Sequence, residues 1–411
     1  MSPKLVPQKQ REFAVEVVRQ LREAGFEAYW AGGCVRDRLL GRDAKDFDVA
    51  TNATPGEIRR VFRRQRTLAI GAAFGVITVL GPREAGQIEV ATFRQDADYS
   101  DGRHPDSVTF TSAEEDASRR DFTINGLFYD PIEDRIIDFV GGREDLARRV
   151  IRAIGRPQER FVEDKLRMLR AIRFAACFDF HLDPATLAAV RDMAEQITVV
   201  SPERIAMEMR RMLVEPARVA ALRMMVESGL AAAILPELLA DGQTPHPRFE
   251  EILVVLGRLR QPGFPLALGA LFSGLVDPAG AGRVCRRWRL SNKETHRACW
   301  LVEHQHALCD ARRMPWSRLQ PTLVAGGIED LLALCEAVTP GGNEVSYCRT
   351  LLEQPRETLD PKPLLSGDDL LEHGVPSGPR YRSLLDRVRA AQLDGEISTR
   401  QEAIELVDRL M

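Results

Sequence analysis

The sequence is poor in the patterns that build disulfide frameworks and zinc sites. Its seven cysteines are scattered and odd in number, and no two of them form a C-x-x-C pair. This pattern argues against a disulfide framework or a structural zinc site and favours free thiols in a reducing compartment. The sequence also lacks a run of 18 apolar residues, and its first residues have no apolar stretch typical of a signal peptide. We therefore expect a cytoplasmic protein that does not span a membrane.

Neither sign of charge is in large excess, and no low-complexity tract is present. The formal net charge is −3, and of the 411 residues 44% are hydrophobic and 28% are charged. This composition is typical of a globular protein, and the length predicts two or more domains. Because the chain is not basic overall, any RNA partner has to be bound through local basic patches.

Hydrophobic periodicity divides the chain into two parts. Over the first ~140 residues strand and helix patterns alternate, with strands expected near 26–31, 46–49, 76–80 and 88–93. From about Arg143 onward, long helical patterns rich in Leu, Ala, Arg and Glu take over. The sequence therefore predicts an α+β fold in which a small α/β head precedes a largely helical remainder. Chain breaks are expected near Gly141, near Pro202 and in the loop 242–247.

Asp46-Phe47-Asp48 is the sharpest feature of the head. On a strand, both carboxylates point to one face and Phe47 points to the core. Such a pair forms a hard oxygen site suited to Mg²⁺, with Asp46 and Asp48 as the metal ligands. Glu89 lies between two β-branched residues of another expected strand, where an acid is costly unless it is exposed, paired or metal-bound. We expect Glu89 to be a third acid of the site, although a D-x-D pair alone is more often a solvated strand face.

Gly32-Gly33 lies between an expected strand and a short expected helix, about a dozen residues before the acids. Glycines at such a turn let backbone N–H groups approach a phosphate closely, and the helix N-terminus adds a favourable dipole. Arg36 follows one turn later, where its guanidinium can reach a triphosphate. A glycine pair alone is usually only a tight turn. Together with the acids, it indicates phosphoryl-transfer chemistry.

Arg119-Arg120-Asp121-Phe122-Thr123-Ile124-Asn125 gathers two cations, an acid and an amide. One interpretation of this segment is a helix terminus with a capping Asp. The functional interpretation places Arg120 on a nucleotide phosphate. It places Asn125 on the ribose or in a structural hydrogen bond.

The segment Glu163–Arg173 has a polar residue at every third position and is predicted to form one helix. Its repeating residues are Asp164, Arg167, Arg170 and Arg173. Neighbours at this spacing lie close on a helix surface, so the first two are expected to be in contact. A salt-bridged surface helix is the alternative interpretation.

The chemistry of Asp164 and Arg167 favours a role in reading a base. A carboxylate only accepts hydrogen bonds and a guanidinium only donates them. Cytosine and adenine each present an amino donor beside a ring acceptor, which such a pair matches. Uracil and guanine present a carbonyl and an N–H in those places. The pair is therefore a candidate for selecting C and A without a nucleic-acid template.

Three long motifs in a fixed order resemble a known family. AGGCVRDRLLGRDAKDFDVAT, RRDFTINGL and ERFVEDKLRMLRAIRFA are similar to motifs shared by class II tRNA nucleotidyltransferases and bacterial poly(A) polymerases. The segment FRQDADYSDGRHPDSVTF resembles the mobile loop of the same family. The resemblance is clear from about residue 26 to about residue 180.

The resemblance implies a polymerase-β-like nucleotidyltransferase head followed by helical parts. The expected boundaries are a catalytic head at 1–142, a neck that recognises the base at 143–205, a body at 206–310 and an RNA-binding tail at 311–411. The roles carried over are metal binding and catalysis for Asp46 and Asp48; catalysis, as the third acid, for Glu89; phosphate contacts for Gly33, with its neighbour Gly32, and for Arg36 and Arg120; sugar contact for Asn125; base reading for Asp164 and Arg167; and proximity to the nucleotide for Arg170 and Arg173.

The implied activity is the Mg²⁺-dependent, template-independent addition of C and A from CTP and ATP to the 3′ end of tRNA. A local excess of ten Lys and Arg over five Asp and Glu between Arg143 and Arg173 suits an RNA backbone. A second basic cluster comprises Arg283, Arg286, Arg287 and Arg289 around Trp288. CC-only, A-only and poly(A) products remain open within the family. A non-catalytic RNA-binding protein is the alternative from another class.

Overall fold

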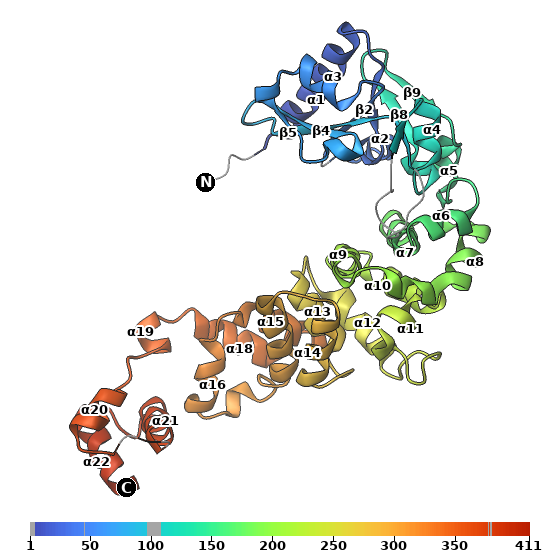
Figure 1. The fold of residues 1–411 in the computed structure, drawn as a ribbon. Coiled ribbons are helices and arrows are strands. Elements are labelled where there is room, and N and C mark those ends of the chain that lie inside the picture. The colour runs from blue at the N-terminus through green and yellow to red at the C-terminus, as the bar shows by residue number, and fades with distance from the viewer. Residues whose placement is uncertain (1–4, 45, 97–107, 377, 379) are drawn as a thin grey trace. The chain divides into compact units, whose positions relative to one another are not determined.

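The computed structural model describes the chain apart from residues 1–4, 45, 97–107, 377 and 379 (Figure 1). The chain forms two compact units, Met1–Pro245 and His246–Met411. The boundary between them falls inside the loop 242–247, where the sequence predicts a break. The finer boundaries at 142, 205 and 310 stay predictions. None of the helices in the described ranges has the length and apolarity needed to cross a membrane.

A seven-stranded mixed sheet forms the centre of the head, with the strand order β3-β4-β5-β2-β1-β8-β9. Among the described strands of this sheet, β2 pairs with β5 in parallel and the other pairings are antiparallel. Two short pairs lie outside it, β6 with β7 and β10 with β11. The strands are β1 (Ala28–Ala31), β2 (Asp48–Thr51), β3 (Thr67–Leu68), β4 (Val76–Leu80), β5 (Gln87–Thr92), β6 (Arg94–Asp96), β7 (Val108–Phe110), β8 (Leu127–Asp130), β9 (Arg135–Asp138), β10 (Val150–Ile151) and β11 (His181–Leu182).

Helix α1 covers the sheet with the apolar stripe that the sequence predicts. Its residues Phe13, Val17, Val18 and Leu21 are buried, and the helix contacts β1, β2 and β5. The helices of the first unit are α1 (Pro7–Glu23), α2 (Gly33–Leu39), α3 (Pro55–Val61), α4 (Ala113–Ser118), α5 (Gly142–Arg148), α6 (Pro157–Glu163), α7 (Leu166–Phe178), α8 (Pro184–Met193), α9 (Pro202–Leu213), α10 (Arg218–Glu227) and α11 (Leu230–Ile234).

The strand expected over the two aspartates begins later than predicted. Asp46 precedes β2, which starts at Asp48, so the two carboxylates are not successive members of one strand face. Phe47 is buried as expected and packs edge-on against Trp30, with ring centroids 4.7 Å apart. This packing of Phe47 fixes the chain where it enters the strand.

The single helix expected over residues 163–173 is a wrong prediction, because the chain breaks at Asp164. Helix α6 ends at Glu163, Asp164 has extended backbone angles (φ −147°, ψ 103°), and α7 begins at Leu166. The side chain of Asp164 accepts a hydrogen bond from the Leu166 amide at 3.0 Å. This local bond competes with helix continuation, a habit of Asp that periodicity does not reveal. Helix α7 then packs against α9 and α10.

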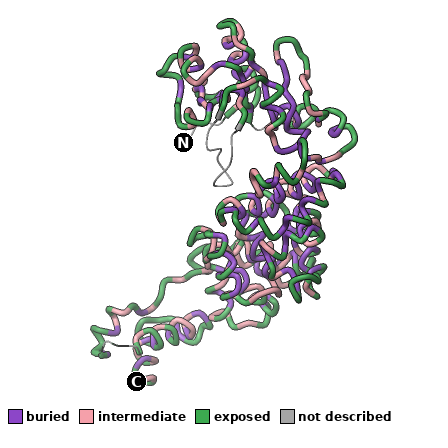
Figure 2. Tube along the Cα trace, turned by 45° about the vertical axis from the view of Figure 1, so that its right-hand side comes forward, coloured by how far each residue is buried: buried purple, intermediate pink, exposed green. Residues whose placement is uncertain are grey.

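The second unit is helical throughout its described secondary structure. Most of its helices carry both buried and exposed residues (Figure 2), as expected for amphipathic packing. Its helices are α12 (Phe249–Arg258), α13 (Phe264–Phe272), α14 (Pro278–Arg287), α15 (Asn292–His304), α16 (Trp316–Leu323), α17 (Ile328–Val338), α18 (Asn343–Leu352), α19 (Arg356–Leu359), α20 (Gly367–Glu372), α21 (Arg380–Leu393) and α22 (Arg400–Leu410). The α+β fold predicted from the sequence is thereby confirmed.

Candidate active site

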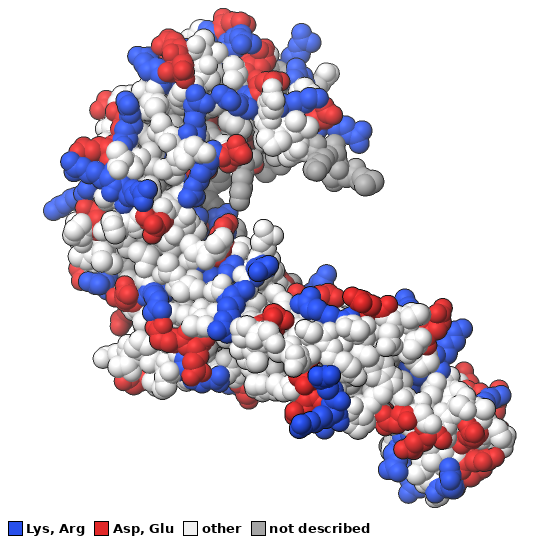
Figure 3. Space-filling view, turned by 180° about the vertical axis from the view of Figure 1, so that it is seen from behind, with Lys and Arg blue, Asp and Glu red and all other residues white. Residues whose placement is uncertain are grey.

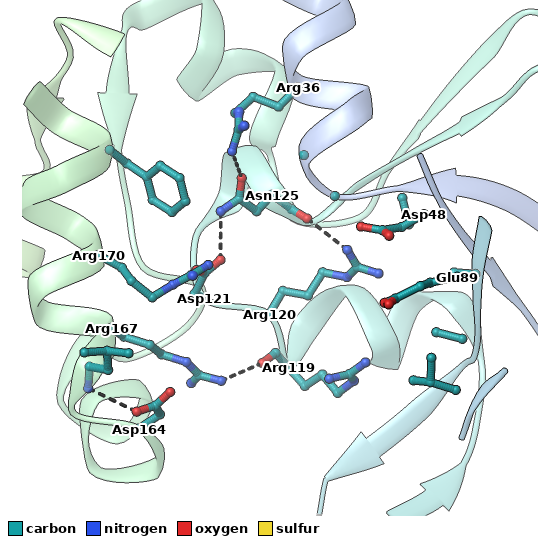
Figure 4. Close-up of a pocket in the computed structure, with 18 of the residues that line it drawn as sticks. Arg36, Asp48, Glu89, Arg119, Arg120, Asp121, Asn125, Asp164, Arg167 and Arg170 are labelled. Atoms are coloured by element: carbon teal, nitrogen blue, oxygen red, sulfur yellow. Dashed lines mark hydrogen bonds and ion pairs between the residues drawn. The ribbon is translucent and has the colours of Figure 1, made fainter. Parts of the chain in front are cut away.

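A cleft of about 720 Å³ in the first unit brings together most of the predicted site residues. Figure 4 shows Asp48 and Glu89 at one end of it and Asp164 and Arg167 at the other. Seven arginines and four acidic residues line this cleft, so its walls carry an excess of positive charge. Its lining is Ala31, Gly32, Gly33, Arg36, Asp48, Val49, Ala50, Val76, Glu89, Ala91, Arg119, Arg120, Asp121, Asn125, Asp164, Leu166, Arg167, Arg170, Phe174, Arg204 and Arg211.

The sheet register places two carboxylates side by side. Asp48 on β2 is the direct partner of Glu89 on the parallel strand β5, so both side chains rise from the same face. Desolvation by the surrounding cleft and the charge of Glu89 raise the pKa of Asp48 to about 6. A bound cation would stabilise the ionised form of Asp48, which is disfavoured in this way.

The acid pair fits a divalent cation by its chemistry, since both donors are carboxylate oxygens. Among the described residues, however, no group of three or more His, Cys, Asp or Glu is arranged to hold a metal ion. Asp46 is exposed and does not line the cleft. The structure therefore brings Asp48 and Glu89 together in the cleft, whereas Asp46 is not part of its lining, although its charge also acts on Asp48.

Gly32 forms the floor of the cleft beside Arg120. It has φ 72° and ψ −127°, a conformation that residues with a side chain rarely adopt. A Cβ atom at this position would lie 3.0 Å from Nη1 of Arg120. The same guanidinium donates to the Asn125 carbonyl at 3.2 Å and to Asp116 at 2.9 Å. The glycine thus lets a fixed cation approach the backbone at the turn into α2.

Asn125 makes structural hydrogen bonds, one of the two roles expected for it, in a buried network whose partners the sequence does not identify. Its amide nitrogen donates to Asp121 at 2.9 Å, and its amide oxygen accepts from Arg36 at 2.7 Å. Asp121 also accepts from Arg170 at 2.6 Å. Burial alone would raise the pKa of Asp121, but Arg170 and Asn125 outweigh it and hold that pKa at about 2. This network ties the segment after α4 to α2 and α7.

One aromatic ring supports several of these cations. The guanidinium carbons of Arg36 and Arg170 each lie 5.2 Å from the centroid of the Phe174 ring, and that of Arg173 lies 4.1 Å from it. Cations at such distances are attracted by the negative face of the ring. Arg173 itself does not line the cleft, and its Nε donates to Glu208 at 2.6 Å.

Asp164 and Arg167 both line the cleft. The sequence predicts that they contact each other, but their side chains bind other partners. Asp164 accepts from Arg204 at 2.7 Å. Arg167 forms an ion pair with Glu163 and donates to the Arg119 carbonyl at 3.2 Å. The break before α7 explains the difference, because it removes Asp164 from the helical spacing on which the prediction relied.

Several lining residues were missed by sequence reasoning. Arg119 and Asp121 belong to the motif 119–125, for which the sequence indicates a nucleotide contact only at Arg120 and Asn125. Arg204 and Arg211 lie seven positions apart on α9, hence on one face of that helix. Because both residues lie outside the motifs, no sequence pattern links them to the site.

In the second unit the expected basic cluster surrounds a core residue. Trp288 is buried, and the four arginines near it are exposed. Figure 3 shows Lys and Arg mixed with Asp and Glu on the face drawn, without a broad surface of one sign. Contact with an RNA backbone on such a surface depends on small groups of arginines.

Comparison with known proteins agrees with the arrangement of the cleft. Residues 28–152 match the poly(A) polymerase head domain, and residues 179–241 match the probable RNA- and SrmB-binding site of polymerase A. The CCA-adding enzyme of Geobacillus stearothermophilus is 35% identical over 401 residues, covering 95% of both chains.

Two solved structures extend this comparison. The CCA-adding enzyme of Bacillus stearothermophilus in complex with CTP has a TM-score of 0.79 and 31% identity, covering 98% of both chains. The Thermotoga maritima CCA-adding enzyme complexed with tRNA shares the fold, with a TM-score of 0.66 and 22% identity over 97% of this chain and 95% of that one. Because the head matches the family model and these relatives are similar over nearly the whole chain, the chain belongs to the family of CCA-adding enzymes, which are tRNA nucleotidyltransferases.

Proposed function

We propose that this protein builds or repairs the CCA end of tRNA, adding C and A from CTP and ATP with Mg²⁺ as the metal ion. The observation that carries the proposal is the single cleft in which adjacent carboxylates and a candidate base-reading pair lie at opposite ends. A nucleoside triphosphate needs both, since one end of it is a polyanion and the other a base. The full-length similarity to CCA-adding enzymes supports the same reaction.

In this reaction the 3′-hydroxyl of the RNA attacks the α-phosphate of the bound nucleotide, a new phosphodiester bond forms, and pyrophosphate leaves. Asp48 and Glu89 would hold the divalent cation, with Asp46 as a further proposed ligand. When bound there, the cation would lower the pKa of the attacking hydroxyl and neutralise charge on the leaving group. Arg120 and the backbone at Gly32 receive the phosphates, and their fixed positions spare the site reorganisation during the reaction.

The arginine network orients the nucleotide between these two ends. Arg36 and Arg170 are held by Asn125 and Asp121, so their guanidinium groups keep their direction when the triphosphate enters. The Asn125 side chain donates one N–H and accepts one hydrogen bond at its oxygen in this network. Its proposed contact with the sugar can use the second N–H of the amide or the other lone pair of the oxygen.

Selection of the base is assigned to Asp164 and Arg167. The carboxylate accepts from the amino group of cytosine or adenine, and the guanidinium donates to the adjacent ring acceptor. A carbonyl in place of the amino group would face the carboxylate without a partner, which disfavours U and G.

The RNA partner and the location of the protein are part of the proposal. The basic excess between Arg143 and Arg173 and the exposed arginines near Trp288 are the surfaces proposed to contact tRNA by its shape and backbone. The seven cysteines are all free thiols. That state fits the reducing cytoplasm, where we place the protein.

The product is identified by a single assay. Purified protein with Mg²⁺ is given tRNA that ends before the first C, after C or after CC, with CTP and ATP singly and together. We expect two C residues and one A, and no extension beyond them. Addition that stops after CC, addition of A alone, or a long A tract would each replace this product with another. No incorporation on any substrate would reject the enzymatic function.

Two variants test the division of labour in the cleft. Asp164→Ala and Arg167→Ala are expected to weaken discrimination of CTP and ATP from UTP and GTP while metal binding stays intact. Initial rates with each of the four nucleotides, alongside Mn²⁺ titration, separate the two effects. Unchanged discrimination in both variants would remove these residues from base reading.

A further inference from the structure

Besides Arg167, a second arginine lines the base-reading end of the cleft. This residue is Arg204 on α9, and it binds the carboxylate of Asp164. Its Nη2 atom donates to Oδ2 of Asp164 at 2.7 Å, and both side chains are 17% exposed. The two residues lie 40 positions apart, and both line the cleft. None of the motifs that identify the site contains Arg204.

The other oxygen of the same carboxylate is also fixed. Oδ1 of Asp164 accepts from the Leu166 amide at 3.0 Å. The backbone bond anchors one oxygen at the start of α7, and Arg204 anchors the other from a different helix. With both oxygens held, the plane of the carboxylate cannot turn. Each oxygen still has a lone pair free for a further donor.

We infer that Arg204 is a positioning residue that sets base specificity by locking Asp164 in its accepting orientation, an inference that rests on the proposed function. A locked carboxylate offers only lone pairs to an incoming base. The amino group of cytosine or adenine satisfies it, whereas the carbonyl of uracil or guanine meets an acceptor and stays unpaired. A carboxylate free to rotate would turn aside and let water fill the gap, so the penalty against the wrong base would fall.

The other base-reading residue, Arg167, keeps its orientation without Arg204. Arg167 is held by Glu163 and by the Arg119 carbonyl, so its orientation does not depend on Arg204. Loss of Arg204 should therefore leave the donor half of the pair in place and disturb only the acceptor half. The predicted result is a gain of U and G incorporation, with a smaller change in the use of C and A.

The test compares Arg204→Ala with the wild type in two assays. The first measures kcat/KM for CTP and UTP on tRNA that lacks its CCA end. The second measures equilibrium binding of each nucleotide with Mg²⁺ by calorimetry. The ratio of CTP to UTP is expected to fall roughly 10- to 100-fold, the range for losing a hydrogen bond to a charged group. Because the bond involves a single N–H group, Arg204→Lys should restore part of the ratio.

Two controls separate positioning from a structural role. Arg152→Ala removes an arginine that pairs with Asp145 and Asp183 in the same unit, away from the cleft lining. It should lower the melting temperature without changing the ratio. In an Asp164→Ala background, Arg204→Ala should change the ratio no further, because the two residues act through one interaction.

Different results would reject the proposed function and the inferred role of Arg204. A wild-type protein that incorporates no CTP would reject the proposed function, while the binding ratios would still report on Arg204. An unchanged ratio in Arg204→Ala would overturn the inference. So would an equal loss of activity with all four nucleotides, or an additive effect in the Asp164→Ala background.

Discussion

Removing Arg170 tests whether the network behind the cleft is a source of stability. Asp121 is 9% exposed and has a pKa of about 2, against an ordinary value of 3.8. At about 1.36 kcal/mol for each pKa unit, its ionised form contributes about 2 kcal/mol to the free energy of unfolding at neutral pH. Arg170→Met leaves this carboxylate buried with only the Asn125 and Phe122 N–H groups as partners. We expect a loss of about 3 kcal/mol at pH 7, because an uncompensated buried charge is costly.

The pH dependence gives the sharper signature. In the wild type the pKa of Asp121 is depressed by folding. Its contribution is therefore complete above about pH 4 and is lost as the pH falls toward 2. In Arg170→Met burial raises the same pKa, so protonation between about pH 7 and 4 relieves the destabilisation. The difference in unfolding free energy between the two proteins should narrow as the pH falls.

Urea unfolding of the first unit, followed by circular dichroism at pH 7, 5 and 4, measures this difference. The matched control is Arg148→Met, which removes an exposed ion pair with Glu144 and should cost less than about 1 kcal/mol at every pH. Equal losses in the two variants, or a loss in Arg170→Met that does not change with pH, would refute the reasoning.

Two further predictions concern the other end of the cleft. Gly32→Ala forces a Cβ atom to 3.0 Å from Arg120 and strains a positive φ, so steady-state kinetics should show at least a ~10-fold loss of activity. Gly25→Ala carries the positive-φ strain without a nearby atom and should lower stability only, and equal kinetic losses in both variants would exclude a crowding effect. Asp48→Asn removes one of two adjacent carboxylates. Calorimetry should show weaker Mn²⁺ binding, and unchanged metal affinity with full activity would contradict the role assigned to it and Glu89.

The sequence predicts the head well because its signals are local. The helix over Phe13–Leu21, the glycine turn and the strand carrying Glu89 follow from periodicity and turn chemistry, and each is present. The pairing of Asp48 with Glu89 needs a sheet register, which a single sequence does not determine.

The end of the cleft proposed to read the base was harder to predict, for a definite physical reason. The side chain of Asp164 captures a backbone amide and ends a helix that its neighbours would otherwise continue. Arg204 approaches from another helix, so its partnership with Asp164 exists only after α7 and α9 have packed. Residues joined by tertiary packing leave no pattern at a fixed spacing.

The Phe174 ring beneath three guanidinium groups has a consequence for how the cleft responds to its surroundings. A carboxylate that gathers cations loses its charge on acidification, but an aromatic ring carries no proton to gain. The ring has no net charge, and the attraction of its electron-rich face to Arg36, Arg170 and Arg173 does not titrate. This part of the cleft therefore keeps its positive potential over a broad pH range, even where the neighbouring acids change their charge.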